Sequence, residues 1–236
     1  MRRLVLAMQL MTCLPLPSVK ADEEDFAAAI RWFPVTGMVI GACAAGGLML
    51  GSKVDPWSGA LLALLVWVAM TGALHLDGLA DIADAVGAAH GDRSRLSLVL
   101  ADPHVGSFGV TAVALQLMTK LVLLRLCAEF VPAWGLIGVA MVARIGPLFW
   151  SRWLPPLHER LASRFRHGVR PVHLLGWSGV AMLFAWWMPG LLIVAALIPS
   201  WAVWLRARIG GISGDGHGAG IEIMESALLA ALVLAR

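Results

Sequence analysis

The sequence predicts an all-α fold, a polytopic integral membrane helical bundle with about seven (six to eight) transmembrane helices. Of its 236 residues, 59% are hydrophobic and only 14% are charged, which is more apolar than a soluble domain with one core. Apolar windows close to the about 20 residues needed to cross hydrocarbon recur along the chain. Lysine and arginine gather in alternate connecting segments, as the positive-inside rule requires. We therefore expect residues 1–236 to form a single membrane-embedded domain.

The N-terminal segment, residues 1–30, is expected to lie at the membrane interface. Arg2 and Arg3 precede a short apolar stretch, a pattern that fits an amphipathic helix on the inner surface. A secretory signal peptide begins in the same way. Pro15 and Pro17 interrupt the apolar stretch, so the interfacial helix is the preferred interpretation.

Longer apolar stretches follow and supply the predicted spans. The stretch at 172–205 is interrupted by MPG at 188–190 and is interpreted as two spans that meet in a tight turn. The last stretch is short and carries two glutamates, so a re-entrant helix there would lower the total to six. The predicted stretches are 33–52, 57–76, 105–127, 130–150, 172–205 and 220–234.

The basic residues set the orientation. With a cytoplasmic N-terminus, 13 of the 18 lysines and arginines lie inside, three lie outside and two lie within spans, an asymmetry that fits the positive-inside rule. The acidic segment 77–104, the basic loop 151–171 and the glycine-rich loop 210–220 then face the cytoplasm. Because this topology accounts for the pI near 9.1, membrane lipid is an expected partner and nucleic acid is not.

Three aspartates form the first candidate site. Residues 75–84 read HLDGLADIAD directly after an apolar stretch. At 100° per residue, Asp77, Asp81 and Asp84 fall within an arc of about 60° on one helix face. Three like charges so close together favour a bound cation, and hard oxygen ligands favour Mg²⁺ or Mn²⁺. The alternative is an ordinary acidic helix start, although the macrodipole favours acids only in the first turn.

A second cluster lies at 102–109, which reads DPHVGSFG. Asp102 and His104 come just before a helix that opens on small residues, and its backbone amides could receive phosphate. Any capped helix can begin in this way, so a purely structural interpretation stays open.

The third cluster is glycine-rich and runs from 210 to 225, GGISGDGHGAGIEIME. Six glycines in the first eleven residues would let backbone amides approach an anion closely, although no Walker lysine follows. A flexible linker also explains the glycines. It does not explain Glu222 and Glu225, because two acids in a membrane helix need a cation, a proton or a basic partner. Lys120 and Arg144 lie within predicted spans and are candidate partners.

Small residues also pattern the third stretch. The pairs Gly37 with Gly41 and Gly47 with Gly51 are GxxxG motifs, which suit close helix packing. If such faces are exposed, they permit homo-oligomers.

Together these segments resemble the cobalamin 5′-phosphate synthase family, also called adenosylcobinamide-GDP ribazoletransferase. The resemblance runs through essentially the whole chain, in motif order: RWFP at 31–34, HLDGLAD at 75–81, the segment 102–109, Arg144 with Pro147, LPP at 154–156, and 210–225. One departure is His104, where many members carry arginine, and the loop at Gly216 and His217 is unusual.

The resemblance implies the last assembly of the nucleotide loop of cobalamin (vitamin B12). Adenosylcobinamide-GDP and α-ribazole, or its 5′-phosphate, would give adenosylcobalamin, or its 5′-phosphate, and GMP. Mg²⁺ is the expected metal, with Mn²⁺ as a substitute. We expect the enzyme in the bacterial cytoplasmic (inner) membrane, with an active site that faces the cytoplasm.

The residues expected to carry this chemistry fall into three groups. Displacement at a pyrophosphate needs charge neutralisation and in-line positioning more than covalent work by the protein. The expected metal ligands are Asp77, Asp81, Asp84, Asp215 and Glu222. The expected catalytic residues are Asp81, Asp84, Asp102 and His104. The expected substrate-binding residues are Arg31, Arg93, Arg95, Gly214, Asp215 and Gly218.

Alternatives from other classes stay open. CDP-alcohol phosphotransferases also carry an Asp-Gly pair followed by spaced aspartates, but Asp81 and Ile82 stand where their motif has Ala and Arg. A cation or proton transporter would use acids along an ion path, some of them near the membrane midplane. A noncatalytic scaffold would tolerate charge-neutral substitutions.

Overall fold

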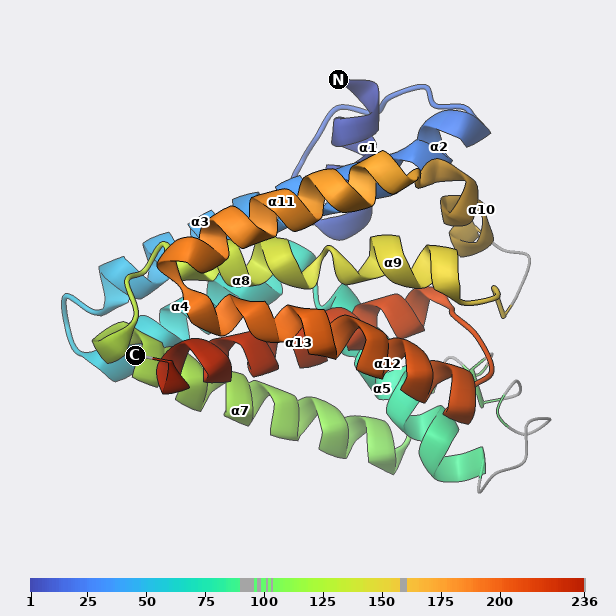
Figure 1. The fold of residues 1–236 in the computed structure, drawn as a ribbon. Coiled ribbons are helices and arrows are strands. Elements are labelled where there is room, and N and C mark those ends of the chain that lie inside the picture. Colours follow the sequence, from blue (N-terminus) through green and yellow to red (C-terminus); the bar gives the residue numbers. More distant parts are fainter. Residues whose placement is uncertain (90–95, 97–98, 101, 103, 158–160, 236) are drawn as a thin grey trace.

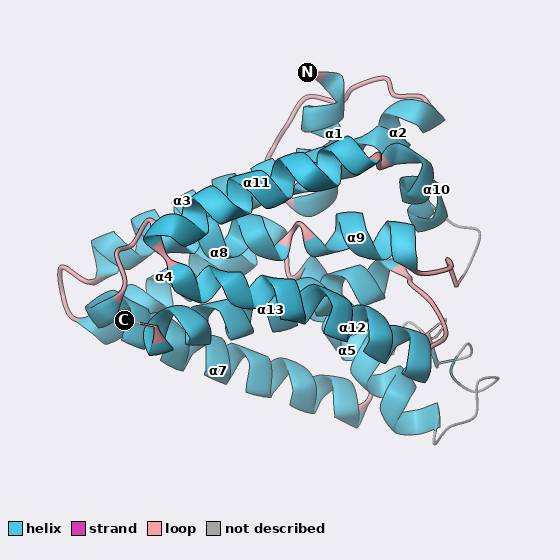
Figure 2. Cartoon of the chain, viewed as in Figure 1, coloured by secondary structure: helices cyan, strands magenta, loops and turns pink. Residues whose placement is uncertain are grey.

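The computed structural model describes residues 1–89, 96, 99–100, 102, 104–157 and 161–235. Over these residues the chain is helical, with turns and loops between the helices and a single isolated bridge from Pro156 to Ile212 in place of a sheet (Figure 2). The predicted all-α fold is confirmed.

The described elements are α1 (Arg2–Met11), α2 (Glu23–Ala29), η1 (Ile30–Trp32), α3 (Phe33–Gly51), α4 (Pro56–Thr71), α5 (Leu74–Ala89), α7 (Ser107–Phe130), α8 (Gly135–Ala143), α9 (Gly146–Trp153), α10 (Leu161–Gly168), α11 (Pro171–Trp187), η2 (Pro189–Ile193), α12 (Val194–Arg208) and α13 (Gly214–Leu234). Figure 1 shows the long helices running roughly along one axis of the bundle. Helices α5, α9 and α12 finish at one end of the bundle, and the C-terminus lies at the other.

Four described helical segments are long and apolar enough to cross a membrane: 23–51, 107–130, 189–208 and 214–234. Helices α4 and α5 pass the same test as a pair bent by 84°, which gives up to five spans. The predicted total of about seven is therefore not reached. The chain breaks the stretch 130–150 into α8 and α9, of nine and eight residues, and α11 has only 17 residues.

The bend between α4 and α5 places the first acidic motif on a helix of its own. Gly72 ends α4 in the left-handed conformation, with φ of 58°, and Ala73 follows with φ of 60°. Glycine adopts this region without strain, whereas alanine does so rarely. The helix therefore turns sharply before His75, and the predicted span 57–76 ends several residues early.

Helices also replace parts of the predicted loops. The first part of the acidic segment 77–104 is helical, because α5 extends to Ala89. The basic segment 151–171 contains the end of α9 and all of α10. The turn predicted at 188–190 is confirmed, because α11 ends at Trp187 and η2 begins at Pro189.

The predicted glycine-rich loop 210–220 is wrong beyond residue 213. Ser213 caps a helix that begins at Gly214, since its hydroxyl accepts a hydrogen bond from the Gly216 amide at 3.0 Å. Glycine suits this helix because α5 packs closely against it. A Cβ on Gly218 would lie only 3.2 Å from the Cα of His75. Packing against α5 thus outweighs the low helix propensity of glycine.

The N-terminal segment belongs to the folded bundle. Helix α1 forms as predicted, but Leu6, Ala7 and Met11 are buried against the protein. Arg3 pairs with Asp25 at 2.7 Å and with Glu24 at 3.1 Å. Part of the apolar face of this helix therefore packs on its own chain, and the interfacial position of the segment stays a prediction.

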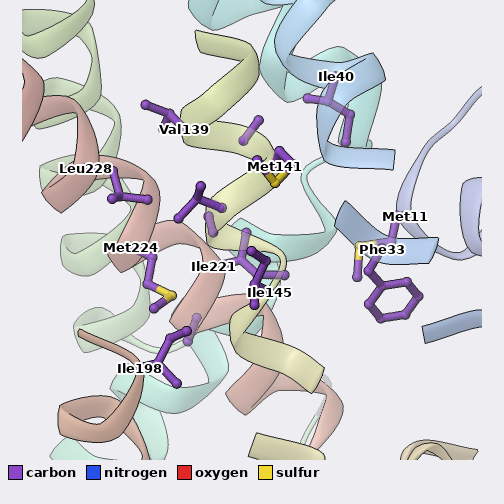
Figure 3. Close-up of a cluster of buried hydrophobic side chains, with 14 of the residues drawn as sticks. Met11, Phe33, Ile40, Val139, Met141, Ile145, Ile198, Ile221, Met224 and Leu228 are labelled. Atoms are coloured by element: carbon purple, nitrogen blue, oxygen red, sulfur yellow. The ribbon is translucent and has the colours of Figure 1, made fainter. Parts of the chain in front are cut away.

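The GxxxG motifs of α3 are also used inside the chain. A Cβ on Gly41 would lie 2.5 Å from the carbonyl oxygen of Leu136 in α8, and Gly47 packs against Ala63 in α4. These faces are therefore occupied by helices of the same chain, and the possible homo-oligomer stays a prediction that does not rest on them. Behind them lies the apolar core, where Ile40 of α3 and Met141 of α8 are fully buried (Figure 3).

We expect Gly41→Leu to lower the free energy of unfolding by about 1–3 kcal/mol, because overpacking would force the α3 and α8 backbones apart. Gly46→Leu is the matched control, since a Cβ there meets nothing within 4 Å. Thermal unfolding of both variants in one detergent, followed by tryptophan fluorescence, measures the difference. Equal melting temperatures would contradict the packing interpretation.

Candidate active site

The three aspartates of the first motif lie on α5, as predicted, in three different environments. Asp77 is exposed, Asp81 is half-buried and Asp84 is buried. The Asp81 carboxylate interacts electrostatically with Asp215, Asp77 and Asp84. Four carboxylates thus gather around α5. One of them, Asp215, lies more than 130 residues from the other three in sequence.

Close packing of α5 on α13 brings the two acidic motifs together. A Cβ on Gly78 would lie 2.9 Å from both the Cα and the carbonyl oxygen of Asp215. Only glycine permits this approach, so the Asp-Gly pair of the HLDG motif has a direct steric role. The Ser213 hydroxyl donates to the Asp215 carboxylate at 3.2 Å and fixes its orientation.

The donor set at this site suits a hard cation. No cationic side chain within the described residues pairs with Asp77, Asp81 or Asp215. Carboxylate oxygens without such partners are the ligands that Mg²⁺ and Mn²⁺ prefer. In the described part of the chain, however, no three of these groups converge closely enough to hold an ion.

Asp84 has a different role in the fold. Its two carboxylate oxygens accept hydrogen bonds from the backbone amides of Gly106, at 2.7 Å, and Gly109, at 2.9 Å. These are the amides that the sequence suggested for phosphate, and that expectation is wrong because Asp84 already occupies them. Glycine is needed at both positions, since a Cβ at either one would strike the Asp84 carboxylate.

We expect Asp84→Asn to lower the free energy of unfolding by about 1–3 kcal/mol, because the asparagine NH₂ would face a backbone N–H donor and leave it unpaired. The matched control is Asp102→Asn, since Asp102 is exposed. Thermal unfolding of the two variants measures the effect. A melting temperature of Asp84→Asn equal to that of the control would show that the capping bonds contribute nothing.

Asp102 and His104 form an exposed pair before α7. The His104 amide and ring Nδ1 lie 3.0 and 2.7 Å from the Asp102 Oδ1. Hydrogen bonds from the backbone and then the side chain of His104 lower the pKa of Asp102, so this carboxylate is a weak base. It holds the imidazole with Nδ1–H directed toward it, which leaves Nε2 as the free acceptor.

The two glutamates of α13 lie in a separate, buried ion-pair network. Lys120 Nζ lies 2.6 Å from both Glu222 Oε2 and Glu225 Oε2, and Arg144 Nη1 lies 2.7 Å from Glu225 Oε1. The predicted basic partners are confirmed. Gln116, which the sequence did not indicate, also donates to Glu222 at 2.9 Å. Glu222 is therefore not grouped with the aspartates.

A cavity of about 190 Å³ lies beside the acids, between α1, α3, α5, α10 and α13. Asp77 and Asp215 line it together with Gly214 and Gly218, four of the residues predicted from the sequence. A larger cavity of about 260 Å³ between α9, α11 and α12 has no titratable residue in its lining. The smaller cavity is therefore the candidate for chemistry.

Sequence reasoning missed the two titratable residues His75 and His217 of this cavity, as well as its apolar lining. Both sit inside recognised motifs, but only the packing of α5 on α13 gives them a common cavity. Arg31 does not line the cavity; its side chain donates to the Gly168 carbonyl oxygen. Arg93 and Arg95 lie outside the described residues.

Comparison with known proteins identifies the family of the chain. The model of the family described as cobalamin-5-phosphate synthase matches residues 3–233. The chain is 52% identical over 238 residues to the adenosylcobinamide-GDP ribazoletransferase of Novosphingobium aromaticivorans, covering 99% of this chain and 97% of that one.

Two further relatives bear the same name. The protein of Laribacter hongkongensis is 46% identical, with 100% of this chain and 98% of the relative covered. The protein of Thiobacillus denitrificans is 45% identical, with 97% and 94% covered. No solved structure matches the chain. The match from one end to the other shows that the chain belongs to the cobalamin-5-phosphate synthase family.

Proposed function

We propose that this chain catalyses the last assembly step of the cobalamin nucleotide loop. It would transfer the cobinamide phosphate of adenosylcobinamide-GDP to α-ribazole or its 5′-phosphate. The observation that carries the proposal is the grouping of Asp77, Asp81 and Asp215 beside a cavity, in a chain that its family covers almost completely.

The reaction is a displacement at phosphorus. A ribose hydroxyl of the acceptor forms a new O–P bond to the phosphate attached to cobinamide, the pyrophosphate P–O bond breaks, and GMP leaves. The hydroxyl proton passes to a base or to water. Such a reaction depends on positioning and charge neutralisation, so the acidic face of α5 is the expected centre.

Asp77, Asp81 and Asp215 would hold Mg²⁺, with Asp84 contributing a lone pair that its amide bonds leave free. The bound metal would neutralise the charge of the pyrophosphate and stabilise the leaving GMP. Glu222 remains a predicted ligand, but its bonds to Lys120 and Gln116 would have to open first.

Residues outside the acidic cluster would supply the remaining roles. His104, oriented by Asp102 at 2.7 Å, would accept the hydroxyl proton through its free Nε2. Arg93 and Arg95 would bind phosphate, with Arg31 as a further candidate. Gly214 and Gly218 would let the substrate approach the backbone of α13.

We propose further that the site faces the cytoplasm from the inner membrane. Helix α10 and the end of α12 carry basic residues, and Figure 1 shows both at the end of the bundle where α5 finishes. Positively charged loops favour the cytoplasmic side, where anionic lipid headgroups are also available.

The test is incubation of the purified full-length protein with adenosylcobinamide-GDP, α-ribazole and Mg²⁺, followed by mass spectrometry. The expected products are adenosylcobalamin and GMP in equal amounts, with loss of both on chelation by EDTA and recovery on addition of Mg²⁺. Absence of product with Mg²⁺ and with Mn²⁺ would overturn the proposal. Ion flux into liposomes containing the protein, without any product, would favour the transporter alternative.

A further inference from the structure

The cavity beside the acids contains two histidines whose hydrogen bonds are incomplete. His75 is 2% exposed and His217 is 5% exposed. Both line the cavity, and two of their ring nitrogens, Nε2 of His75 and Nδ1 of His217, are buried without a hydrogen-bond partner among the described residues. Unpaired polar atoms are rare in protein interiors and call for a ligand or a water. The partners of the other ring nitrogens decide what these two atoms can do.

His75 offers a hydrogen-bond donor. Its Nδ1 lies 3.4 Å from Nη2 of Arg144, and a guanidinium can only donate. Nδ1 is therefore the acceptor of this pair, and the neutral ring carries its proton on Nε2. Arg144 is itself held by Glu225 at 2.7 Å. The buried ion-pair network thus fixes the tautomer of a residue in the cavity wall.

His217 offers the complementary acceptor. The Ser151 hydroxyl donates its one proton to the Pro147 carbonyl oxygen at 2.7 Å. At 3.4 Å from His217 Nε2, the same oxygen can only accept, so Nε2 carries the ring proton. The Nδ1 of His217 is then an unpaired acceptor. Stacking on Trp150, with centroids 6.0 Å apart, holds the ring in place.

Apart from these histidines and the acids Asp77 and Asp215, the residues that line the cavity are apolar and partly aromatic. Phe33 and Phe165 meet edge to face, with ring centroids 5.6 Å apart, and Met11 of α1 completes that side. At about 190 Å³, the cavity is smaller than the about 300–1,000 Å³ that drug-sized ligands occupy. A corrinoid does not fit, whereas a bicyclic aromatic ring does.

We propose that this cavity binds the nucleoside acceptor, α-ribazole. The inference rests on the proposed function and gives one of the two substrates its binding site. The benzimidazole ring of α-ribazole lies between the apolar walls, near Phe33 and Phe165. Hydroxyl groups of its ribose accept a hydrogen bond from His75 Nε2 and donate one to His217 Nδ1. Asp77 and Asp215 line the same cavity, so the nucleoside is held beside the acidic site.

The test is a calorimetric titration of the full-length protein in detergent with α-ribazole and, separately, with its free benzimidazole base. No adenosylcobinamide-GDP is present, so binding is measured without turnover. Gly218→Leu adds a side chain at the lining of the cavity, where a Cβ would lie 3.2 Å from the Cα of His75, and is expected to weaken binding of both compounds at least tenfold. Gly176→Leu is the matched control, because a Cβ there meets nothing within 4 Å, and its affinities should equal those of the wild type.

A second variant separates recognition of the ribose from recognition of the ring. His217→Gln keeps an amide NH₂ for Ser151 but removes the acceptor at Nδ1. It is expected to weaken α-ribazole binding about tenfold and to leave binding of the free base unchanged. Its KM for α-ribazole should rise while its KM for adenosylcobinamide-GDP stays the same. A structural defect would alter both ligands and both constants.

The outcomes separate this inference from the proposed function. Suppose that the wild-type protein turns over its substrates and that both Gly218→Leu and His217→Gln bind α-ribazole with wild-type affinity. This result would overturn the cavity assignment and leave the proposed function in place. A wild-type protein that neither binds α-ribazole nor releases GMP would overturn both. Should Gly218→Leu fail to fold, His217→Gln and Phe165→Leu give the same comparison, with the loss in Phe165→Leu expected for both compounds.

Discussion

The Asp81→Asn variant is expected to release GMP from adenosylcobinamide-GDP at least about 10²–10³-fold more slowly than the wild type, a loss typical of removing one group that stabilises transition-state charge. Asp81 lies at the centre of the acidic site, with Asp77, Asp84 and Asp215 as its charged neighbours. Replacing its carboxylate by an amide removes a charged oxygen ligand while it preserves the shape of the side chain.

The same substitution should not destabilise the fold. Among the described residues no cationic side chain pairs with Asp81, and its charged neighbours are all acidic. Neutralising it relieves repulsion, so the melting temperature should stay the same or rise. Expression and membrane insertion should be intact. Loss of activity with unchanged stability distinguishes a catalytic residue from a structural one.

Asp22→Asn is the matched control for this experiment. Asp22 caps α2 by accepting a hydrogen bond from the Asp25 amide at 2.7 Å, and asparagine caps helices equally well. GMP release by this variant should equal that of the wild type. Undiminished turnover by Asp81→Asn would contradict the metal assignment.

The Lys120→Met variant is expected to lose about 3–5 kcal/mol of stability, the usual cost of leaving a buried charge without its partner. The Lys120 side chain is 3% exposed and contacts both Glu222 and Glu225 at 2.6 Å. Without it, Glu225 keeps Arg144 as a partner, but the buried Glu222 carboxylate keeps only the neutral Gln116 amide among the contacts described above. For a chain of this length, the expected fall in melting temperature is about 10 °C.

A double variant tests whether charge balance is the cause. In Lys120→Met with Glu222→Gln, one positive and one negative charge are removed and the pair of Arg144 with Glu225 remains. Its melting temperature should recover at least half of the loss. Lys53→Met, at an exposed position, is the control and should change little. A double variant as unstable as Lys120→Met would show that packing rather than charge accounts for the loss.

Much of the site was predictable because its signals are local. The spacing of Asp77, Asp81 and Asp84 places them on one helix face, and the helix is present. Acids within an apolar helix require partners, and Lys120 and Arg144 are indeed bound to Glu222 and Glu225. In each case the inference needed only helix periodicity and the cost of burying charge.

The errors arose where a contact distant in sequence competes with a local preference. The glycines at 214–220 suggest a loop, but α5, Trp150 and Trp201 pack against them and make a helix favourable. The small residues before α7 suggest a phosphate site, but Asp84 reaches their amides from 22 residues away.

By itself, the sequence determined the membrane class, the all-α fold and the family motifs, because composition, helix periodicity and residue spacing are local properties. The tertiary structure alone decided that Asp215 approaches Gly78, and that His75 and His217 share one cavity. It also decided which hydrogen bonds of these histidines are already made. Such contacts depend on how closely two distant helices pack, which no single stretch of residues specifies.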